Sequence, residues 1–267
     1  MKIYVNEVLR EVAEDSTAYS IREVFKADAD ILIYNSFPLK QDIEIKEFDK
    51  IVLIKRGEMP SKEELEALMV ARHTPFVHEE LKKAKVGIAG LGGLGSNAAV
   101  SLARMGIGKL LLIDYDIVEP SNLNRQYYFV RHIGMKKTEA MKDVISDCNP
   151  FVEVEVRDMK LDENNIKDVF KDVDIIIEAF DDPTAKATIV RTVLSSMKDK
   201  KVIAASGVSG FYSSNSIITR KLKDNLYMIG DMETEAAIGC GLMASRVAVA
   251  ANHEANAAVR IILGEEI

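Results

Sequence analysis

The sequence has few cysteines and no long run of apolar residues. Cys148 and Cys240 are the only cysteines among 267 residues, too few for a framework of disulfide bonds. Neither belongs to a C-x-x-C pair, which excludes a structural zinc site built from two such pairs. No apolar run reaches the roughly 18 residues that a membrane-spanning helix needs. We therefore expect a reduced, cytoplasmic protein without a membrane span, in which both cysteines are small packed residues.

The sequence also lacks an excess of positive charge. Its 42 acidic residues outnumber its 35 Lys and Arg residues, which gives a formal net charge of −7. That balance argues against a general partner of nucleic acids or of anionic membranes. Hydrophobic residues make up 48% of the chain, enough to build a sizeable packed core in one large or two small domains.

A glycine-rich loop lies between a predicted strand, Lys85–Ala89, and a predicted helix, Ser96–Gly106. A second strand, Leu110–Ile113, follows and ends at Asp114. Glycines at this spacing allow a sharp turn and let backbone N–H groups approach a phosphate at the helix N-terminus; they are Gly90, Gly92, Gly93 and Gly95. Asp114, about 20 residues past the loop, is placed to accept hydrogen bonds from a ribose hydroxyl. The sequence predicts a nucleotide-binding β-α-β unit.

A more specific pattern follows the second strand. It reads Asp114-Tyr-Asp-Ile-Val-Glu-Pro-Ser-Asn-Leu-Asn-Arg-Gln126 and then Gly134-Met-Lys-Lys137. With the glycine loop, it resembles the activating enzymes of ubiquitin-like proteins, whose pattern is G-x-G-G-x-G, then D-x-D-x-V-x-x-S-N-L-x-R-Q, then G-x-x-K. The resemblance is to the ThiF/MoeB type, above all to thiamine-biosynthesis ThiF, and covers residues 72–267. It implies an α/β fold with a Rossmann-like ATP-binding domain of the ubiquitin-activating type.

The first 57 residues have the pattern of a small separate domain. Predicted strands and a helix occur in the order β-β-α-β-β, which fits a β-grasp, or ubiquitin-like, fold: Lys2–Asn6, Leu9–Val12, a helix capped within residues 15–17, Ile31–Tyr34 and Lys50–Lys55. Ile21, Val24 and Phe25 are expected to form the apolar face of that helix.

This N-terminal domain resembles the sulfur carrier ThiS itself, but it lacks the carrier's end. Free carriers end in Gly-Gly, whereas here Gly57 is followed by Glu58 and the chain continues. The domain therefore cannot present a terminal glycine carboxylate, and we interpret it as a structural or docking domain. We divide the chain into a ThiS-like domain (1–57), a connecting helical segment (58–83) and an adenylation domain (84–267).

The remaining pattern alternates strands and helices, as a parallel sheet requires. Strands are expected at Val152–Val156, Val173–Ala179 and Lys201–Ala205, and helices at Asn164–Phe170, Pro183–Met197 and Gly241–Leu263. Met228–Glu235 is expected to be a loop preceding Cys240. The last helix carries a stripe of small residues, Ala244, Ala248, Ala251 and Ala255, and we expect it to pack on the sheet or at the interface of a homodimer.

The resemblance assigns roles to several residues. It implies that Arg125 and Asn122 contact the phosphates of ATP; the planar fork of an arginine suits bidentate phosphate binding. It implies that Lys137 is the lysine of G-x-x-K, although Lys136 is adjacent and a shift by one residue is the alternative. It also implies that Arg72, before the nucleotide domain, reaches the ATP site of the partner subunit.

The resemblance also implies a carboxylate for Mg²⁺ at the end of the predicted strand Val173–Ala179. Asp181 is our choice, because ligands bind such sheets at the carboxyl ends of parallel strands. Asp182 is the alternative, although it precedes Pro183 and can instead be a helix N-cap. Lys186 stands where relatives often have arginine, a change that bears on phosphate contact.

The implied reaction is ATP-dependent adenylation of the C-terminal glycine of a small ubiquitin-like sulfur carrier, for thiamine thiazole synthesis. Its cofactors are ATP and Mg²⁺, and its partner is a carrier ending in Gly-Gly. One alternative is an oxidoreductase that uses the glycine loop for a nicotinamide or flavin. Two others are a noncatalytic nucleotide-binding scaffold and a relative that activates a MoaD-like carrier or a tRNA nucleoside.

Overall fold

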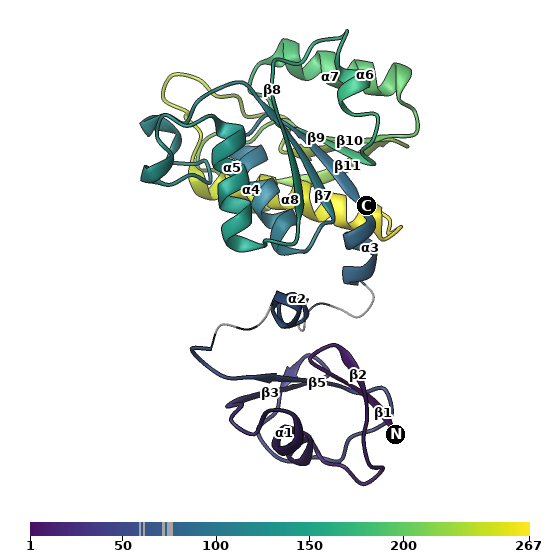
Figure 1. Cartoon of the computed structure of the whole chain (residues 1–267). Helices are drawn as coiled ribbons and strands as arrows, with labels where there is room; N and C mark the ends of the chain where they lie inside the picture. Colours follow the sequence, from purple (N-terminus) through teal and green to yellow (C-terminus); the bar gives the residue numbers. More distant parts are fainter. Residues whose placement is uncertain (59, 61, 71–72, 74–76) are drawn as a thin grey trace. The chain divides into compact units, whose positions relative to one another are not determined.

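The structure is a computed structural model that describes residues 1–58, 60, 62–70, 73 and 77–267. Its chain divides into two compact units, Met1–His78 and Glu79–Ile267. Figure 1 shows the ribbon of both units. Within the described residues, no helix is both long and apolar enough to cross a bilayer.

The first unit contains a five-stranded sheet in the order β2-β1-β5-β3-β4. Its strands are β1 (Lys2–Val5), β2 (Val8–Glu11), β3 (Ile31–Tyr34), β4 (Phe37–Pro38) and β5 (Lys50–Ile54). β1 runs parallel to β5, and the other neighbours are antiparallel. This is the expected β-grasp arrangement, in which helix α1 (Ala18–Lys26) follows β2 and precedes β3 along the chain.

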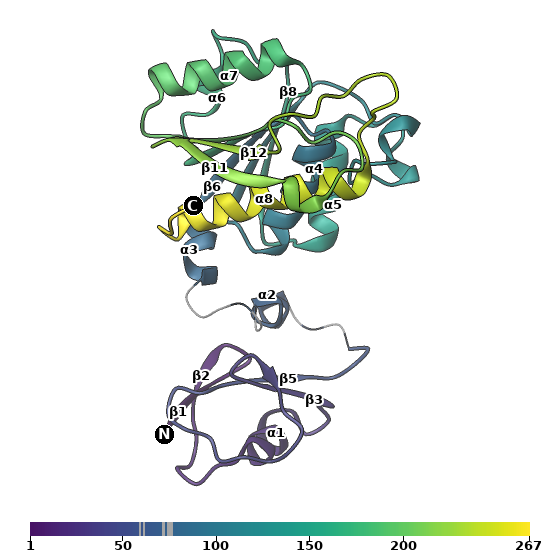
Figure 2. The same ribbon diagram turned by 180° about the vertical axis from the view of Figure 1, so that it is seen from behind.

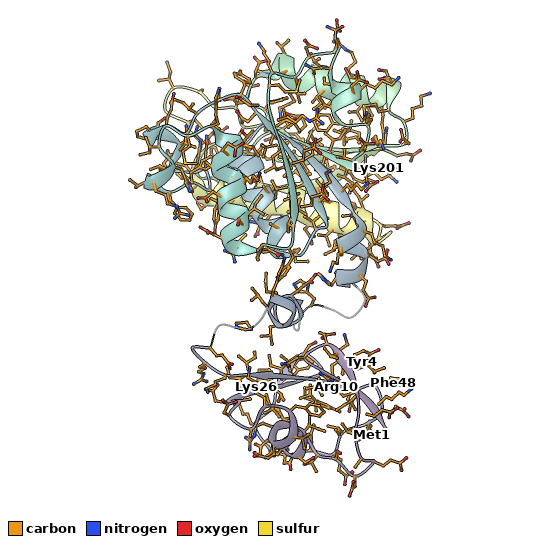
Figure 3. All side chains as sticks on the ribbon, in the orientation of Figure 1. Met1, Tyr4, Arg10, Lys26, Phe48 and Lys201 are labelled. Carbon is orange, nitrogen blue, oxygen red and sulfur yellow. The ribbon has the colours of Figure 1, made fainter. Side chains whose placement is uncertain are left out.

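Helix α1 begins at the expected cap and buries one apolar stripe. The Thr17 side chain accepts a hydrogen bond from the Ser20 N–H, and the Ser20 side chain accepts one from the Thr17 N–H. Ile21 is buried in the core beneath the sheet, but Val24 is 74% exposed and its predicted core position is wrong. Phe25 is also exposed, and its ring lies 5.8 Å from the guanidinium of Arg10, which Figure 3 labels.

A second helix of this unit, α2 (Lys62–Val70), contributes Leu68 to a small apolar cluster. There Leu68 packs with the buried side chains of Ile33 and Val52. These two residues are direct partners in the register of β3 and β5, so they share one face of the sheet. The core around α1 is a separate cluster. The β-grasp sheet therefore has apolar cover on both faces. Helix α3 (Val77–Lys83) follows α2.

The second unit contains a seven-stranded sheet in the order β11-β12-β10-β9-β6-β7-β8. Its strands are β6 (Lys85–Ala89), β7 (Lys109–Asp114), β8 (Glu153–Asp158), β9 (Ile175–Glu178), β10 (Lys201–Ala205), β11 (Ile218–Lys223) and β12 (Leu226–Gly230). All neighbours are parallel except the edge pair of β11 and β12. The fold is α/β and Rossmann-like, as expected.

Helices cover both faces of this sheet. Figures 1 and 2 show α6 and α7 on one face and α4, α5 and α8 on the other. Their bounds are α4 (Gly93–Arg104), α5 (Lys137–Cys148), α6 (Ile166–Val169), α7 (Pro183–Ser196) and α8 (Ala244–Ile262), with short 3₁₀ turns η1 (Pro120–Asn122), η2 (Val130–His132) and η3 (Ser214–Ser216). The central strand β9, with the sequence IIIE, is buried along its whole length because both of its faces are covered.

Several sequence-based boundaries need correction. Helix α4 begins at Gly93 rather than Ser96, so Gly93 and Gly95, the last two glycines of the loop, lie in its first turn. The segment predicted as the loop Met228–Glu235 starts inside strand β12, which pairs with β11 in an antiparallel ladder. Along α8, Ala251 and Ala255 are buried inside the unit, so they are not free to face a partner subunit. Cys148 and Cys240 are half-buried rather than fully packed.

Candidate functional site

The order in which the parallel strands are added to the sheet reverses between β6 and β9. From β6 the strands proceed through β7 to β8 on one side, and from β9 through β10 to β12 on the other. In such sheets ligands bind outside the carboxyl ends of the strands at this switch point. Ala89 and Glu178 are direct partners at these two strand ends. The glycine loop follows Ala89, and the segment that carries Asp181 follows Glu178.

The glycine loop is packed so closely at Gly90 and Gly95 that neither position admits a side chain. A Cβ atom at Gly95 would lie 1.9 Å from the carbonyl oxygen of Gly90, and Gly90 itself has a φ of +92°. A Cβ atom at Gly90 would lie 3.0 Å from the carbonyl oxygen of Ala179, which brings the loop against the segment after β9. The N-cap of α4 is Gly92, which supplies no side-chain acceptor. First-turn N–H groups of α4 are therefore available to an anion.

Asp114 lies at the end of β7 and is bound to the glycine loop. Its Oδ2 accepts a hydrogen bond from the Leu91 N–H at 2.6 Å, and its Oδ1 accepts one from the Asp116 N–H at 2.8 Å. The carboxylate is buried, and each oxygen retains a second acceptor site. The ribose role of Asp114 therefore stays a prediction.

Lys137 and Lys136 have different environments. Lys137 is buried, and its Nζ lies 2.8 Å from Oδ2 of Asp116. Lys136 is exposed, and its Nζ lies 3.3 Å from Oδ2 of Asp158. Asp116 therefore links the two residues, since its carboxylate holds the ammonium of Lys137 and its N–H donates to Oδ1 of Asp114.

Arg125 and Gln126 lie beside the start of α4. Asn97, in the first turns of α4, donates hydrogen bonds from Nδ2 to the carbonyl oxygens of Gly93 at 2.7 Å and of Arg125 at 3.1 Å. The Arg125 guanidinium donates from Nη1 to Oδ1 of Asn124 at 2.9 Å. Arg125 Nε and Gln126 Oε1 are buried polar atoms for which the described part of the chain provides no hydrogen-bond partner.

Two further side chains fasten this segment. The Ser96 hydroxyl accepts a hydrogen bond from the Tyr127 N–H at 2.9 Å, and the Tyr128 hydroxyl donates to the carbonyl oxygen of Leu91 at 2.9 Å. Burial, with smaller contributions from Asp114 and Asp116, raises the pKa of Tyr128 above its usual range. Tyr128 is therefore a neutral hydrogen-bond donor.

Asn122 is buried at the end of η1, where its Oδ1 accepts a hydrogen bond from the Glu119 N–H at 3.0 Å. This bond shapes the turn that carries Arg125. The structure thus assigns Asn122 a local structural contact, and its phosphate role stays a prediction.

Asp181 and Asp182 are separated by their contacts. Asp182 is the N-cap of α7, and its side chain accepts a hydrogen bond from the Ala185 N–H at 2.7 Å. Asp181 is exposed and makes no hydrogen bond or ion pair with the residues that the structure describes. Its carboxylate is therefore available to a ligand. Arg72, the remaining predicted site residue, lies outside the described residues.

Sequence reasoning missed Asn97, Ser96 and Tyr128, which join the glycine loop to the Arg125 segment. Tyr128 is the second residue after the quoted motif, and Ser96 and Asn97 directly follow the glycines, so their neighbourhood was the available signal. It also missed Glu178, which is fully buried and lies 2.6 Å from Nζ of Lys186. No spacing in the sequence indicates that this ion pair forms.

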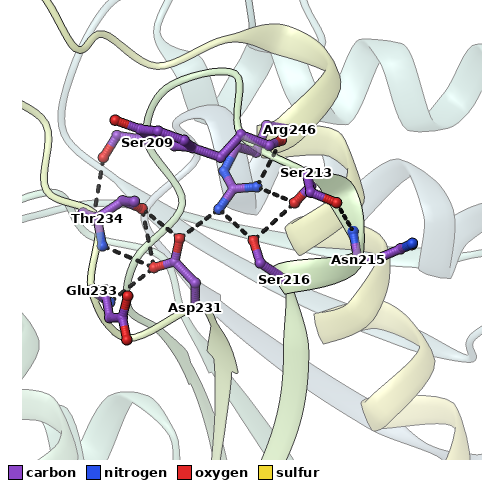
Figure 4. A network of polar contacts seen from close by, with 9 residues as sticks. Ser209, Ser213, Asn215, Ser216, Asp231, Glu233, Thr234 and Arg246 are labelled. Atoms are coloured by element: carbon purple, nitrogen blue, oxygen red, sulfur yellow. Dashed lines mark hydrogen bonds and ion pairs between the residues drawn. The ribbon is translucent and has the colours of Figure 1, made fainter.

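A buried arginine fastens the loops beside the start of α8. Figure 4 shows Arg246 donating from Nη2 to Oδ2 of Asp231 at 2.6 Å and from Nη1 to the carbonyl oxygen of Ser213 at 2.7 Å. Asp231 Oδ1 in turn accepts hydrogen bonds from the N–H groups of Glu233 and Thr234. The next residue, Val247, lies under the glycine loop, since a Cβ atom at Gly93 would be 2.8 Å from its Cγ1.

The matching family models cover most of the chain. Residues 66–267 match the ThiF family, and residues 1–57 match the ThiS-like ubiquitin family. Because the first match spans more than half of the chain, this protein belongs to the ThiF family, within the ThiF/MoeB-type superfamily of ubiquitin-activating-like proteins. It carries a ThiS-like domain at its N-terminus.

Curated relatives align with part of the chain. It is 37% identical over 129 residues to "Adenylyltransferase and sulfurtransferase UBA4" of Candida glabrata, which covers 48% of this chain and 29% of that protein. It is 38% identical over 104 residues to the molybdopterin-synthase adenylyltransferase of Haemophilus influenzae, which covers 39% of this chain and 43% of that protein. The chain thus spans less than half the length of these relatives.

Solved structures share the fold. The tRNA N6-threonylcarbamoyladenosine dehydratase TcdA of E. coli, in complex with ATP, is 21% identical with a TM-score of 0.69, covering 78% of this chain and 98% of that one. PaaA is 28% identical with a TM-score of 0.54, covering 80% of this chain and 71% of that one. These similarities agree with the Rossmann-like topology at the switch point.

Proposed function

We propose that this protein adenylates the C-terminal glycine of a small ubiquitin-like sulfur carrier. In this reaction a carboxylate oxygen of the carrier forms a bond to the α-phosphorus of ATP, the bond from that phosphorus to the bridging oxygen breaks, and pyrophosphate leaves. The carboxylate is already a nucleophile, so the main difficulty is bringing several negative charges together. Positioned cations and N–H groups meet that difficulty.

One observation carries the proposal. Asn97 joins the carbonyl oxygens of Gly93 and Arg125, so an arginine is fixed beside helix N–H groups at the switch point of the sheet. A phosphate chain placed there would meet the first turn of α4 and the guanidinium of Arg125. The unpartnered Nε of Arg125 is a further donor for it. Lys137, held by Asp116, would supply a second cation.

The residues present also fit Mg²⁺. Among the described residues no group of three or more His, Cys, Asp or Glu side chains could hold a metal by itself. Mg²⁺ does not need one, because it usually takes one or two carboxylates and completes its shell with phosphate oxygens and water. Asp181 would supply that carboxylate, and the bound ion would offset phosphate charge.

The ThiS-like domain supports a carrier as the substrate class, and within it we propose a ThiS-like carrier for thiazole synthesis. The test is pyrophosphate exchange into ATP with a panel of ThiS-like and MoaD-like carriers ending in Gly-Gly. We expect exchange that needs both Mg²⁺ and a carrier. Exchange with MoaD-like carriers alone would move the protein to molybdopterin synthesis, and ATP binding without exchange would make it a scaffold.

A modified tRNA nucleoside is the second candidate substrate. The likeness to TcdA, which covers 98% of that chain, favours it. The net charge of −7 disfavours a polyanionic substrate, as does the fused ThiS-like domain. Adding tRNA in place of the carrier in the same assay separates the two: ATP consumption that depends on tRNA would overturn the carrier proposal.

A further inference from the structure

The last residue of β9 holds the segment that carries Asp181. Oε1 of Glu178 accepts a hydrogen bond from the Phe180 N–H at 2.8 Å. Oε2 of the same carboxylate lies 2.6 Å from Nζ of Lys186, in the first turn of α7. One fully buried carboxylate therefore joins the strand end, the segment after it and the following helix.

The same segment is fixed on both sides of Asp181. Before it, the Ala179 N–H donates to the carbonyl oxygen of Ala89 at 2.9 Å, and Ala179 lies against Gly90. After it, Asp182 caps α7. Asp181 is the residue of this segment whose side chain is left for a ligand. Its position therefore depends on how firmly its neighbours are held.

The ammonium of Lys186 interacts with two buried carboxylates, those of Glu178 and Glu254. Glu254 of α8 is fully buried, and neither of its carboxyl oxygens has a hydrogen-bond partner among the described residues. Burial raises the pKa of Glu254, with Lys186 opposing and Glu178 adding to that rise, so all three groups interact. Burial also raises the pKa of Glu178 against the opposing effect of Lys186. A lysine held at 2.6 Å by a buried carboxylate is not free to follow a phosphate chain.

We infer that Lys186 is a positioning residue, which fixes the Asp181 segment through Glu178 and does not itself bind phosphate. This inference rests on the proposed function, because it assigns Asp181 the Mg²⁺ of the adenylation site. Lysine can fill this role as arginine can, since one ammonium donor satisfies Glu178 Oε2. The conservative variant Lys186→Arg should therefore still hold the Asp181 segment in place.

Binding measurements separate the two roles of Lys186. We would titrate ATP into the full chain by calorimetry in the presence of EDTA, and then measure the Mg²⁺ concentration that half-saturates metal-dependent ATP binding. For Lys186→Met we expect an unchanged Kd for ATP without metal and an increase of about tenfold in the half-saturating Mg²⁺ concentration, as for a lost supporting contact of a metal ligand. Lys186→Arg should restore the wild-type value, and Lys171→Met, at an exposed lysine, is the matched control.

The Glu178→Gln variant should reproduce the Mg²⁺ defect, and the double variant should be no worse than either single one, because both act through one contact. If Lys186→Met does not fold with an unpaired buried carboxylate, the Lys186→Met/Glu178→Gln double variant takes its place. A raised Kd for metal-free ATP in either form would overturn the inference and make Lys186 a phosphate ligand. Wild-type protein that binds ATP and Mg²⁺ but shows no exchange with any carrier would refute the proposed reaction alone; wild-type protein that binds no ATP would refute both.

Discussion

Nζ of Lys137 lies 2.8 Å from Oδ2 of Asp116, while the neighbouring Lys136 reaches the exposed Asp158 instead. The first contact holds a buried ammonium on Asp116, whose own N–H donates to Oδ1 of Asp114, the residue predicted to bind ribose. The second contact is a surface ion pair, which typically contributes little. The two lysines that the motif alone leaves interchangeable are therefore distinguished by their surroundings.

The Lys137→Met variant is expected to lower carrier adenylation by about 10²-fold, the usual effect of removing one charge-stabilising group. Lys136→Met is the matched control, and we expect it to retain most of the wild-type rate because its side chain is exposed. The measurement is the initial rate of pyrophosphate exchange at saturating carrier. A larger loss in Lys136→Met would show that the motif is shifted by one residue.

Arg125→Ala and Asp181→Ala are each expected to reduce adenylation by about 10²-fold or more, because we propose that Arg125 donates to phosphate and that Asp181 holds the metal. Asp182→Ala should chiefly destabilise α7, by about 1 kcal/mol for a lost N-cap. Exchange rates and urea denaturation of the three variants give the comparison. A folded Asp181→Ala protein with a near-normal rate would mean that another group binds the metal.

Glu254→Gln is expected to stabilise the protein, and more so as the pH rises. Burial raises the pKa of Glu254 in the folded state, so between its unfolded and folded pKa values the folded chain binds more protons. Wild-type stability then falls with rising pH by about 1.4 kcal/mol per pH unit across this interval, and Gln removes this loss. Urea denaturation at several pH values above about 4.5 gives the difference. A difference that is constant with pH, or equal to that of the exposed control Glu163→Gln, would contradict the prediction.

Removal of residues 1–57 is expected to lower stability or dimerisation more than nucleotide affinity. Leu68 of α2 packs on Ile33 and Val52, so the truncated chain exposes an apolar surface on α2. Calorimetric titration with ATP and a thermal melt compare the two proteins. Loss of ATP binding at an unchanged melting temperature would place the domain in the active site. Mass spectrometry of the full chain with ATP should also find no AMP on residues 1–57.

We expect a homodimer in solution, as the family resemblance implies. Ala251 and Ala255 pack inside the unit, whereas Ala244 is exposed at the start of α8. If this end of the helix meets a partner subunit, Ala244→Glu should weaken the dimer. Light scattering at micromolar concentration measures both proteins, and a wild-type monomer would remove the cross-subunit role predicted for Arg72.

The sequence predicted the parts of the fold that depend on local pattern. The apolar run of β9, the caps Thr17 and Asp182 and the glycine loop all have signals within a few residues. The edge strand β11, with the sequence ITRKLK, was missed because an exposed strand carries no apolar alternation. The buried Glu254 was missed for the opposite reason, since a charged residue within a helix is expected to face solvent.

For the candidate site too, the sequence predicted what local patterns indicate and missed what tertiary packing decides. The motif alone led to the predicted site residues Asp114, Arg125 and Lys137. The hydrogen bonds of Asn97 and the ion pair of Glu178 and Lys186 instead depend on the tertiary packing of separate elements. Nothing in local spacing encodes them. The correction at Val24 has a similar origin. Val24 follows Ile21 by three residues, which places both near one face of α1, but in the folded domain only Ile21 is buried and Val24 is exposed.

The guanidinium of Arg246 also affects how the neighbouring segments fluctuate. It binds the carbonyl oxygens of Tyr212 and Ser213 and the carboxylate of Asp231 at once. Neither segment can leave the start of α8 without breaking bonds that the other shares, so the two are expected to open as one unit in local unfolding. Their amide protons would then exchange with solvent at a common rate. A ligand that steadies one segment would slow hydrogen exchange in the other without touching it.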